Sequence, residues 1–272
     1  MRATSVVAVL WLLSAPSAAE EPTPPSTSYF NERWLDAVVS VESAGKAAGT
    51  AFLVKGCPKD TILVTAAHVV RDESGALRPD LTYRRSDLAK PQPAISDAAL
   101  QSADLGLWAF SRSADLAARR FGWLESAGSP PVIPTEAFID PKIIDVGAPL
   151  LVLGFPLGLQ SAEHNQPIAR HGIVAGHTPA GLLVEAFVFP GNSGGPVVYV
   201  PHIKVGGAIR APHLSEERLI GVVSSYLPYS EAAISVHTKR PRVVFEENSG
   251  LANVVPISEL AVVLRDSAMC RD

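Results

Sequence analysis

A serine set between glycines and a histidine far upstream are the residues of this chain that could carry out nucleophilic chemistry. Ser193 lies in the run GNSGGP, residues 191–196, and His68 ends the run TAAH. Glycines allow a tight turn that exposes the hydroxyl and leaves backbone N–H groups free to bind an oxyanion. A histidine can accept the hydroxyl proton, and a buried aspartate can orient the imidazole. The sequence therefore predicts Ser193 as a nucleophile and His68 as its general base, then general acid.

Two aspartates compete for the role of the orienting carboxylate. Asp104 directly precedes the apolar run LGLW, residues 105–108, which indicates that it begins a buried strand. Asp97 lies in a polar stretch, where we expect solvent to reach its carboxylate. A carboxylate that holds a catalytic imidazole is desolvated, so we favour Asp104. The predicted catalytic residues, His68, Asp104 and Ser193, then follow the chain order His, Asp, Ser.

The runs TAAH, ADLGL, GFPLG and GNSGGP, in this order, resemble those of trypsin-like peptidases of the bacterial HtrA/Deg type. The resemblance extends from about Trp34 to Arg265. It implies an all-β fold of two antiparallel six-stranded β-barrels, with His68 and Asp104 on the first, Ser193 on the second, and the active site between them. Relatives of this type commonly carry a PDZ domain after the protease, and we expect this chain to be without one.

The same resemblance implies which residues receive the substrate. The backbone N–H groups of Gly191 and Ser193 form the oxyanion hole. Phe187 falls near the base of the primary specificity pocket, where trypsin has an aspartate, so we expect cleavage after small or medium aliphatic residues rather than basic ones. The residues that line the pocket and bind the substrate backbone as a strand are Val223, Ser224, Ser225 and Tyr226.

Composition predicts a folded chain rich in β-strands. The 272 residues are 47% hydrophobic and 18% charged, which allows a sizeable core and argues against global disorder. Many short apolar runs are bounded by Gly, Pro, Ser or Asn, with no alternating helices, which favours barrels over a parallel sheet. Expected strands cover 37–41, 49–54, 61–65, 105–110, 150–154, 172–175, 182–188, 196–200, 219–225, 242–245 and 251–255, and expected helices cover 29–36 and 258–265, with Ser258 as the N-cap.

The N-terminus predicts export. Arg2, the apolar run 6–13 and the small residues 17–19 are typical of a cleavable signal peptide, so we expect residues 1–19 to be removed and the protein to be periplasmic or secreted. A Pro- and Ser-rich linker over 20–28 then precedes a first barrel over 29–130 and a second barrel with the C-terminal helix over 131–272.

The net charge and the spacing of the histidines indicate which partners to expect. The net charge of −4 gives no electrostatic case for binding nucleic acid or an anionic membrane, and we expect no stable membrane insertion after signal cleavage. The other six histidines show no metal-ligand spacing, so we expect neither a metal nor a cofactor. Protein or peptide substrates are the expected partners.

Two cysteines, Cys57 and Cys270, make up the whole complement of thiols. In an oxidising compartment such a pair can form a disulfide, which would tie the C-terminus to the loop before His68. The alternative is two free thiols that are too far apart to react.

The pattern Gly-x-Ser-x-Gly around Ser193 also fits the nucleophile elbow of α/β-hydrolases. That motif needs a helix directly after the serine, whereas the following residues, 195–201, favour a strand. We therefore predict a serine endopeptidase that hydrolyses peptide bonds of exported or misfolded proteins through an acyl-enzyme. Two alternatives remain open: a catalytically inactive trypsin-like module that binds peptides, and a hydrolase of small esters.

Overall fold

The computed structural model describes residues 30–31, 33–56, 60–86, 93–102, 105, 107–122, 131–160, 165–201, 216–267 and 269. The predicted signal peptide, the linker, Cys57, Asp104 and Cys270 lie outside these residues, so their predictions stay predictions. Within the described part of the chain, no helix is long and apolar enough to cross a lipid bilayer.

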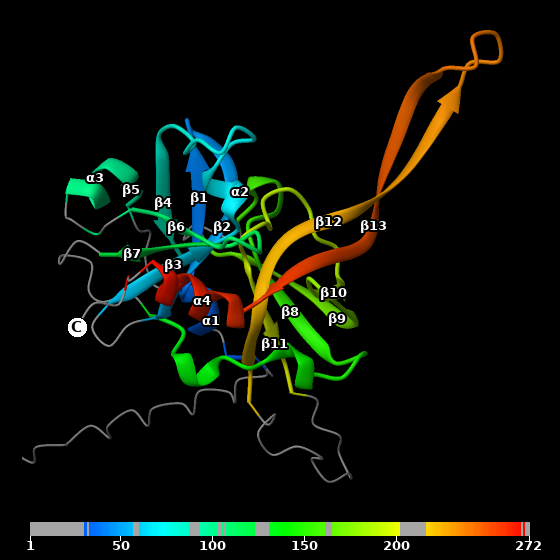
Figure 1. The fold of residues 1–272 in the computed structure, drawn as a ribbon. Helices are drawn as coiled ribbons and strands as arrows, with labels where there is room; N and C mark the ends of the chain where they lie inside the picture. The colour runs from blue at the N-terminus through cyan, green and yellow to red at the C-terminus, as the bar shows by residue number, and fades with distance from the viewer. Residues whose placement is uncertain are drawn as a thin grey trace, which may run out of the picture.

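Two antiparallel β-sheet units, which follow one another along the chain, make up the fold (Figure 1). The first is a seven-stranded sheet of order β5-β4-β1-β2-β3-β7-β6, built from β1 (Val38–Ser43), β2 (Lys46–Lys55), β3 (Thr61–Thr65), β4 (Leu81–Arg85), β5 (Ile95–Ser96), β6 (Ala109–Phe110) and β7 (Ala117–Phe121). The second is a closed barrel of order β10-β13-β12-β11-β8-β9, built from β8 (Pro149–Gly154), β9 (Ile168–Thr178), β10 (Gly181–Glu185), β11 (Pro196–Tyr199), β12 (Arg218–Ile234) and β13 (Pro241–Pro256).

This architecture confirms the predicted all-β, chymotrypsin-like class, with one difference in strand count. The second unit is the expected six-stranded barrel, whereas the first has seven strands and is a sheet that the named strands do not close. Two of its strands, β5 and β6, are only two residues long. The expected strand over 105–110 is therefore reduced to Ala109–Phe110.

In the described part of the chain, four short helices accompany the strands: α1 (Arg33–Asp36), α2 (Ala67–Val70), α3 (Asp97–Ser102) and α4 (Ser258–Asp266). α1 and α4 are the N-terminal and C-terminal helices that the sequence predicts. The cap of α4 differs from the expectation, because Ser258 is its first helical residue and Ile257 precedes it without a side-chain hydrogen bond. Single turns of 3-10 helix lie, among the residues that the structure describes, at 135–137, 141–143 and 156–158.

Among the described residues, three clusters of buried apolar side chains form the core, and one of them joins the two units. One fills the first sheet and one fills the barrel. The third joins Phe52 and Leu116 of the first unit to Leu153 and Val222 of the barrel, and Leu260 of α4 packs into it. Burial of this shared cluster fixes the two units relative to each other, which any site built from both of them requires.

Candidate active site

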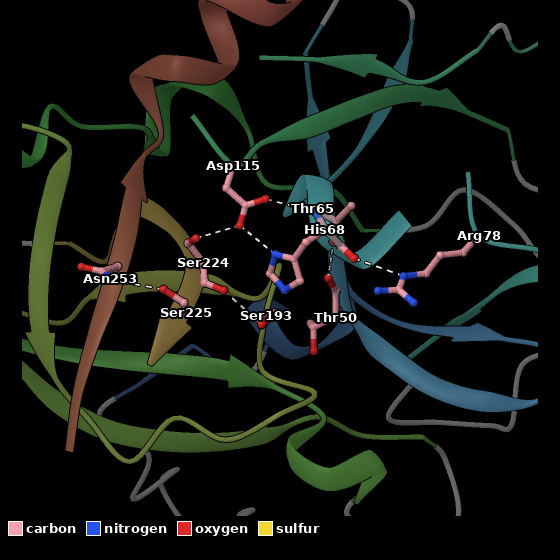
Figure 2. Close-up of polar contacts among 9 residues, drawn as sticks. All are labelled: Thr50, Thr65, His68, Arg78, Asp115, Ser193, Ser224, Ser225 and Asn253. Atoms are coloured by element: carbon pink, nitrogen blue, oxygen red, sulfur yellow. Dashed lines mark hydrogen bonds and ion pairs between the residues drawn. The ribbon is translucent and has the colours of Figure 1, made fainter. Parts of the chain in front are cut away.

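His68 and an aspartate meet because β3 ends at the point where its antiparallel neighbour β7 begins. β3 leads into α2, which carries His68, and β3 pairs antiparallel with β7 so that Thr65 lies opposite Ala117. Two residues beyond that pair on each strand, Asp115 comes beside the start of α2. Its Oδ2 lies 2.7 Å from Nδ1 of His68, and its Oδ1 accepts the backbone N–H of His68 at 3.1 Å (Figure 2).

Asp115 is held by a further hydrogen bond from the barrel. Ser224 Oγ donates to Oδ2 of Asp115 at 2.7 Å. Burial raises the pKa of the Asp115 carboxyl, but the hydrogen bonds from His68 and Ser224 and the charge of His68 outweigh it, so that the pKa lies below its ordinary value. Asp115 is therefore ionised at neutral pH and can orient the imidazole and stabilise an imidazolium.

Ser193 lies on the loop before β11 and contacts Ser224, the barrel residue that also contacts Asp115. Its Oγ donates to the backbone carbonyl of Ser224 at 3.1 Å. Ser224 thus contacts both Asp115 and Ser193, and in Figure 2 the imidazole of His68 lies between those two side chains. The hydroxyl must turn away from the Ser224 carbonyl to bond the imidazole, and a serine side chain turns by rotation about χ1.

The loop that carries Ser193 has a backbone that only glycine adopts easily. Gly191 has φ +100° and Gly194 has φ +84°. A Cβ on Gly191 would lie 2.2 Å from the carbonyl oxygen of Phe155, and one on Gly194 would lie 2.0 Å from that of Thr50. Neither distance is physically possible, so both glycines are needed for this loop to pack against its neighbours.

Thr50 of β2 clamps this loop from the first unit. Its backbone N–H donates to the carbonyl of Ser193 at 2.8 Å, and its Oγ1 donates to the carbonyl of Gly191 at 2.6 Å. The same Oγ1 accepts the N–H of Phe155 at 3.1 Å. With both carbonyls held, the N–H groups of Gly191 and Ser193 are not donated to any acceptor among the described residues. These are the two groups that the sequence assigns to an oxyanion hole.

We expect Thr50→Val to weaken this clamp without removing the site. Valine keeps the shape but leaves the buried carbonyl of Gly191 unsatisfied, which should cost about 1–3 kcal/mol of stability and lower turnover about tenfold. Urea unfolding and peptide hydrolysis measure the two effects. Thr50→Ser, which keeps the hydroxyl, is the matched control, and equal behaviour of the valine and serine variants would contradict the role of the hydroxyl.

Among the described residues, the carboxylate that contacts His68 is Asp115, and the choice of Asp104 stays a prediction. Nδ1 makes its short hydrogen bond to Asp115, and Asp104 lies outside the described residues.

The rival Asp97 is not solvated as expected. It is ion-paired with the buried Arg119 and accepts a 2.6 Å hydrogen bond from the hydroxyl of Tyr83, and burial together with this carboxylate raises the pKa of Tyr83.

A signal for Asp115 is present in the sequence. The tetrapeptide SADL occurs twice, at 102–105 and at 113–116, and only the first copy is followed by a plainly apolar run. The second is followed by AARRF, which forms β7 although it contains two arginines. Arg119 is only 1% exposed, because it pairs with Asp97 and lies over the ring of Trp108. The sequence therefore contains two equivalent candidates for the carboxylate, Asp104 and Asp115.

The residues assigned to substrate binding fall into two groups. Ser224 and Ser225 line a cavity together with Asp115 and Asn253. Ser224 contacts Asp115 and Ser193, and Oγ of Ser225 accepts a hydrogen bond from Asn253. The backbone of Val223 is already occupied by hydrogen bonds with Gly194 and Gly195, and Tyr226 packs against the barrel core. Phe187 is 62% exposed, which does not match a side chain at the base of an enclosed pocket.

Comparison with known proteins places this site in a family. The family model of the trypsin-like peptidase domain matches residues 49–202, more than half of the chain, and includes His68, Asp115 and Ser193. The chain therefore belongs to the trypsin-like peptidase domain family. No curated protein sequence matches it.

Solved structures of HtrA-type proteases share the fold. A variant of the HtrA-type protease AlgW with a tripeptide has a TM-score of 0.52 and 16% identity, over 88% of this chain and 62% of that one. The same variant with a decapeptide has a TM-score of 0.51 and 15% identity, over 88% and 65% of the two chains. The present chain thus spans less than two thirds of the length of these structures.

Proposed function

We propose that this chain is a serine endopeptidase with Ser193 as nucleophile, His68 as general base and Asp115 as the orienting carboxylate. The observation that carries the proposal is the 2.7 Å contact between His68 Nδ1 and Asp115, joined through Ser224 to the Ser193 hydroxyl. A trypsin-like family model alone would fit an inactive relative, but this set of contacts fits proton transfer.

The reaction follows from the position of each group. Ser193 Oγ attacks the carbonyl carbon of the substrate while His68 Nε2 accepts its proton, and Asp115 stabilises the imidazolium that forms. The N–H groups of Gly191 and Ser193 bind the developing alkoxide. His68 then gives its proton to the leaving amine, which leaves an acyl-enzyme on Ser193. Water, activated by His68, hydrolyses that ester and restores the hydroxyl.

The free edge of β12 supports a peptide as substrate. Among the described residues, β11 and the loop before it pair with β12 only as far as Val223, and beyond Val223 β12 pairs with β13 alone. One edge of Ser224–Leu227 is thus available beside Ser193, and an extended peptide can add to it as another strand. The tripeptide and decapeptide in the AlgW structures favour the same substrate class. Exported or misfolded proteins as substrates rest on the predicted signal peptide.

Incubation of the mature chain with denatured casein tests the proposal. We expect cleavage within the casein chain, at sites that can be mapped and that show no preference for Lys or Arg. Ser193→Ala should not cleave casein. A melting temperature of Ser193→Ala equal to that of the parent shows that the loss is chemical. Peptide binding without cleavage would identify the inactive module instead, and turnover of small esters with intact casein would identify the esterase.

A further inference from the structure

The paired strands β12 and β13 extend far beyond the barrel and form an arm, residues 228–248. Pairing continues along it from Pro228 opposite Asn248 to Ile234 opposite Pro241, and residues 235–240 form the distal turn. Figure 1 shows the arm, in orange, projecting away from both sheet units. A ribbon of seven residues per strand is roughly 23 Å long. All of residues 228–247 except Ser235 are exposed.

The arm carries apolar side chains that a two-stranded ribbon cannot bury. Ile234 is 60% exposed, Val236 is 78% exposed and Phe245 is 57% exposed, and Val243 and Val244 lie beside them on β13. Such a ribbon is marginally stable by itself in water, and no other described element covers either face of the arm. Contiguous apolar side chains in such a place mark an interaction site.

The charge of the distal half of the arm is opposite to that of the whole chain. Residues 232–245 contain Lys239, Arg240 and Arg242 and no Asp or Glu, which gives a formal charge of +3. The whole chain carries −4, so the remaining residues carry −7 (−4 less +3). The acids of the arm, Glu231, Glu246 and Glu247, lie on the barrel side of this segment. Within the described part of the chain, none of the three cations is ion-paired.

We propose that the distal arm, residues 232–245, docks on an anionic lipid surface. Apolar side chains next to unpaired cations fit the boundary between lipid headgroups and acyl chains, where Ile234 and Val236 would insert and the cations would contact headgroup phosphates. The length of the arm favours this partner. The Debye length is about 8 Å at physiological ionic strength, so an arm of roughly 23 Å keeps the acidic body outside the range of repulsion by the surface.

This docking is peripheral and differs from membrane insertion. The cations supply a salt-sensitive attraction, roughly fivefold in affinity for each one near the surface, and the apolar turn supplies the remainder. Because β12 runs from Ser224 at the cleft to Ile234 at the tip, docking would hold the cleft at a fixed height above the lipid. The inference does not depend on the peptidase activity proposed above.

Co-sedimentation with vesicles tests the arm directly. We expect the mature chain to bind phosphatidylcholine vesicles that contain phosphatidylglycerol and to dissociate from them as the salt concentration rises. It should not bind vesicles of phosphatidylcholine alone. Substitution of Lys239, Arg240 and Arg242 by Glu should weaken binding by at least about 100-fold. Ile234→Ser with Val236→Ser should weaken it at unchanged net charge.

A matched variant separates the arm from overall charge. Lys46, Arg112 and Lys142 are exposed cations of the body, and their substitution by Glu changes the net charge equally. This control should keep most of the vesicle binding, and equal thermal stability of all variants shows that each is folded. Equal loss by the arm and body variants, or no binding of anionic vesicles by the parent, would overturn the proposal. So would an arm-dependent dimer in sedimentation velocity without vesicle binding.

Discussion

Asp115→Asn lowers kcat/KM for peptide hydrolysis by about 10³–10⁴, as loss of the orienting carboxylate does in other triads of this kind. The amide cannot accept the Nδ1 proton with the strength of a carboxylate, and it can donate to Nδ1 instead, which places the imidazole proton on Nε2. His68 then cannot accept the proton of Ser193. The amide oxygen still accepts the backbone N–H of His68, and the second N–H of the amide can donate to Oγ of Ser224, so the variant should fold.

Two other aspartates provide the controls for this result. Asp104→Asn should keep activity within a few-fold of the parent, because Asp115 already occupies Nδ1 of His68. Asp97→Asn should lower the melting temperature, since it leaves Arg119 buried without its carboxylate, yet should spare kcat at a temperature where the variant is folded. If Asp104→Asn lost as much activity as Asp115→Asn, the orienting carboxylate would be Asp104.

Gly191→Ala should lower kcat by about 10²–10³ with a smaller effect on KM. A Cβ at this position would lie 2.2 Å from the carbonyl oxygen of Phe155, so the loop must shift, and the N–H of residue 191 moves with it. Loss of one oxyanion donor costs about this factor in related enzymes. Steady-state kinetics on a peptide substrate, with circular dichroism to check folding, measures the effect.

Gly176→Ala is the matched control for this prediction. Gly176 lies on β9 with nothing within 4 Å of where its Cβ would be, so the same chemical change should leave kinetics unaltered. A Gly191→Ala variant whose kcat stays within threefold of the parent would show that the N–H of this residue does not stabilise the transition state.

The sequence predicted the fold well where burial and apolar character coincide. The runs at 61–65, 150–154 and 196–200 are strands within one residue, because each has its apolar side chains inside a sheet. β7 was missed for the opposite reason, since Arg119 is buried by its pairing with Asp97 rather than by apolar character. A criterion based on hydrophobic runs cannot detect a strand stabilised in this way, and Asp115 was missed with it.

The arm was missed because it does not depend on a buried face. The sequence predicted separate strands over 219–225, 242–245 and 251–255, whereas β12 and β13 continue through 218–234 and 241–256. Their outer halves are held by backbone pairing alone, which leaves no periodic pattern of apolar residues to read. The net charge of −4 likewise does not reveal a segment of +3, so an argument from the average charge says nothing of the arm.

The catalytic residues themselves were partly predictable. Ser193 and His68 were found because glycine-bounded serine and strand-ending histidine are local patterns. The hydrogen bonds that join them through Ser224 depend on the barrel and the first sheet packing together, and local sequence does not encode that contact. Thr50 was missed for the same reason, since its partners Gly191 and Ser193 lie more than 140 residues away along the chain.

Active-site labelling shows whether Asp115, His68 and Ser193 act as one catalytic unit. A fluorophosphonate should form one adduct per chain, on the peptide that contains Ser193, and should form none with Ser193→Ala. We expect labelling to be slowed by orders of magnitude in Asp115→Asn and to be unchanged in Asp104→Asn. An adduct on another residue, or a folded parent chain that takes up no label, would contradict the account.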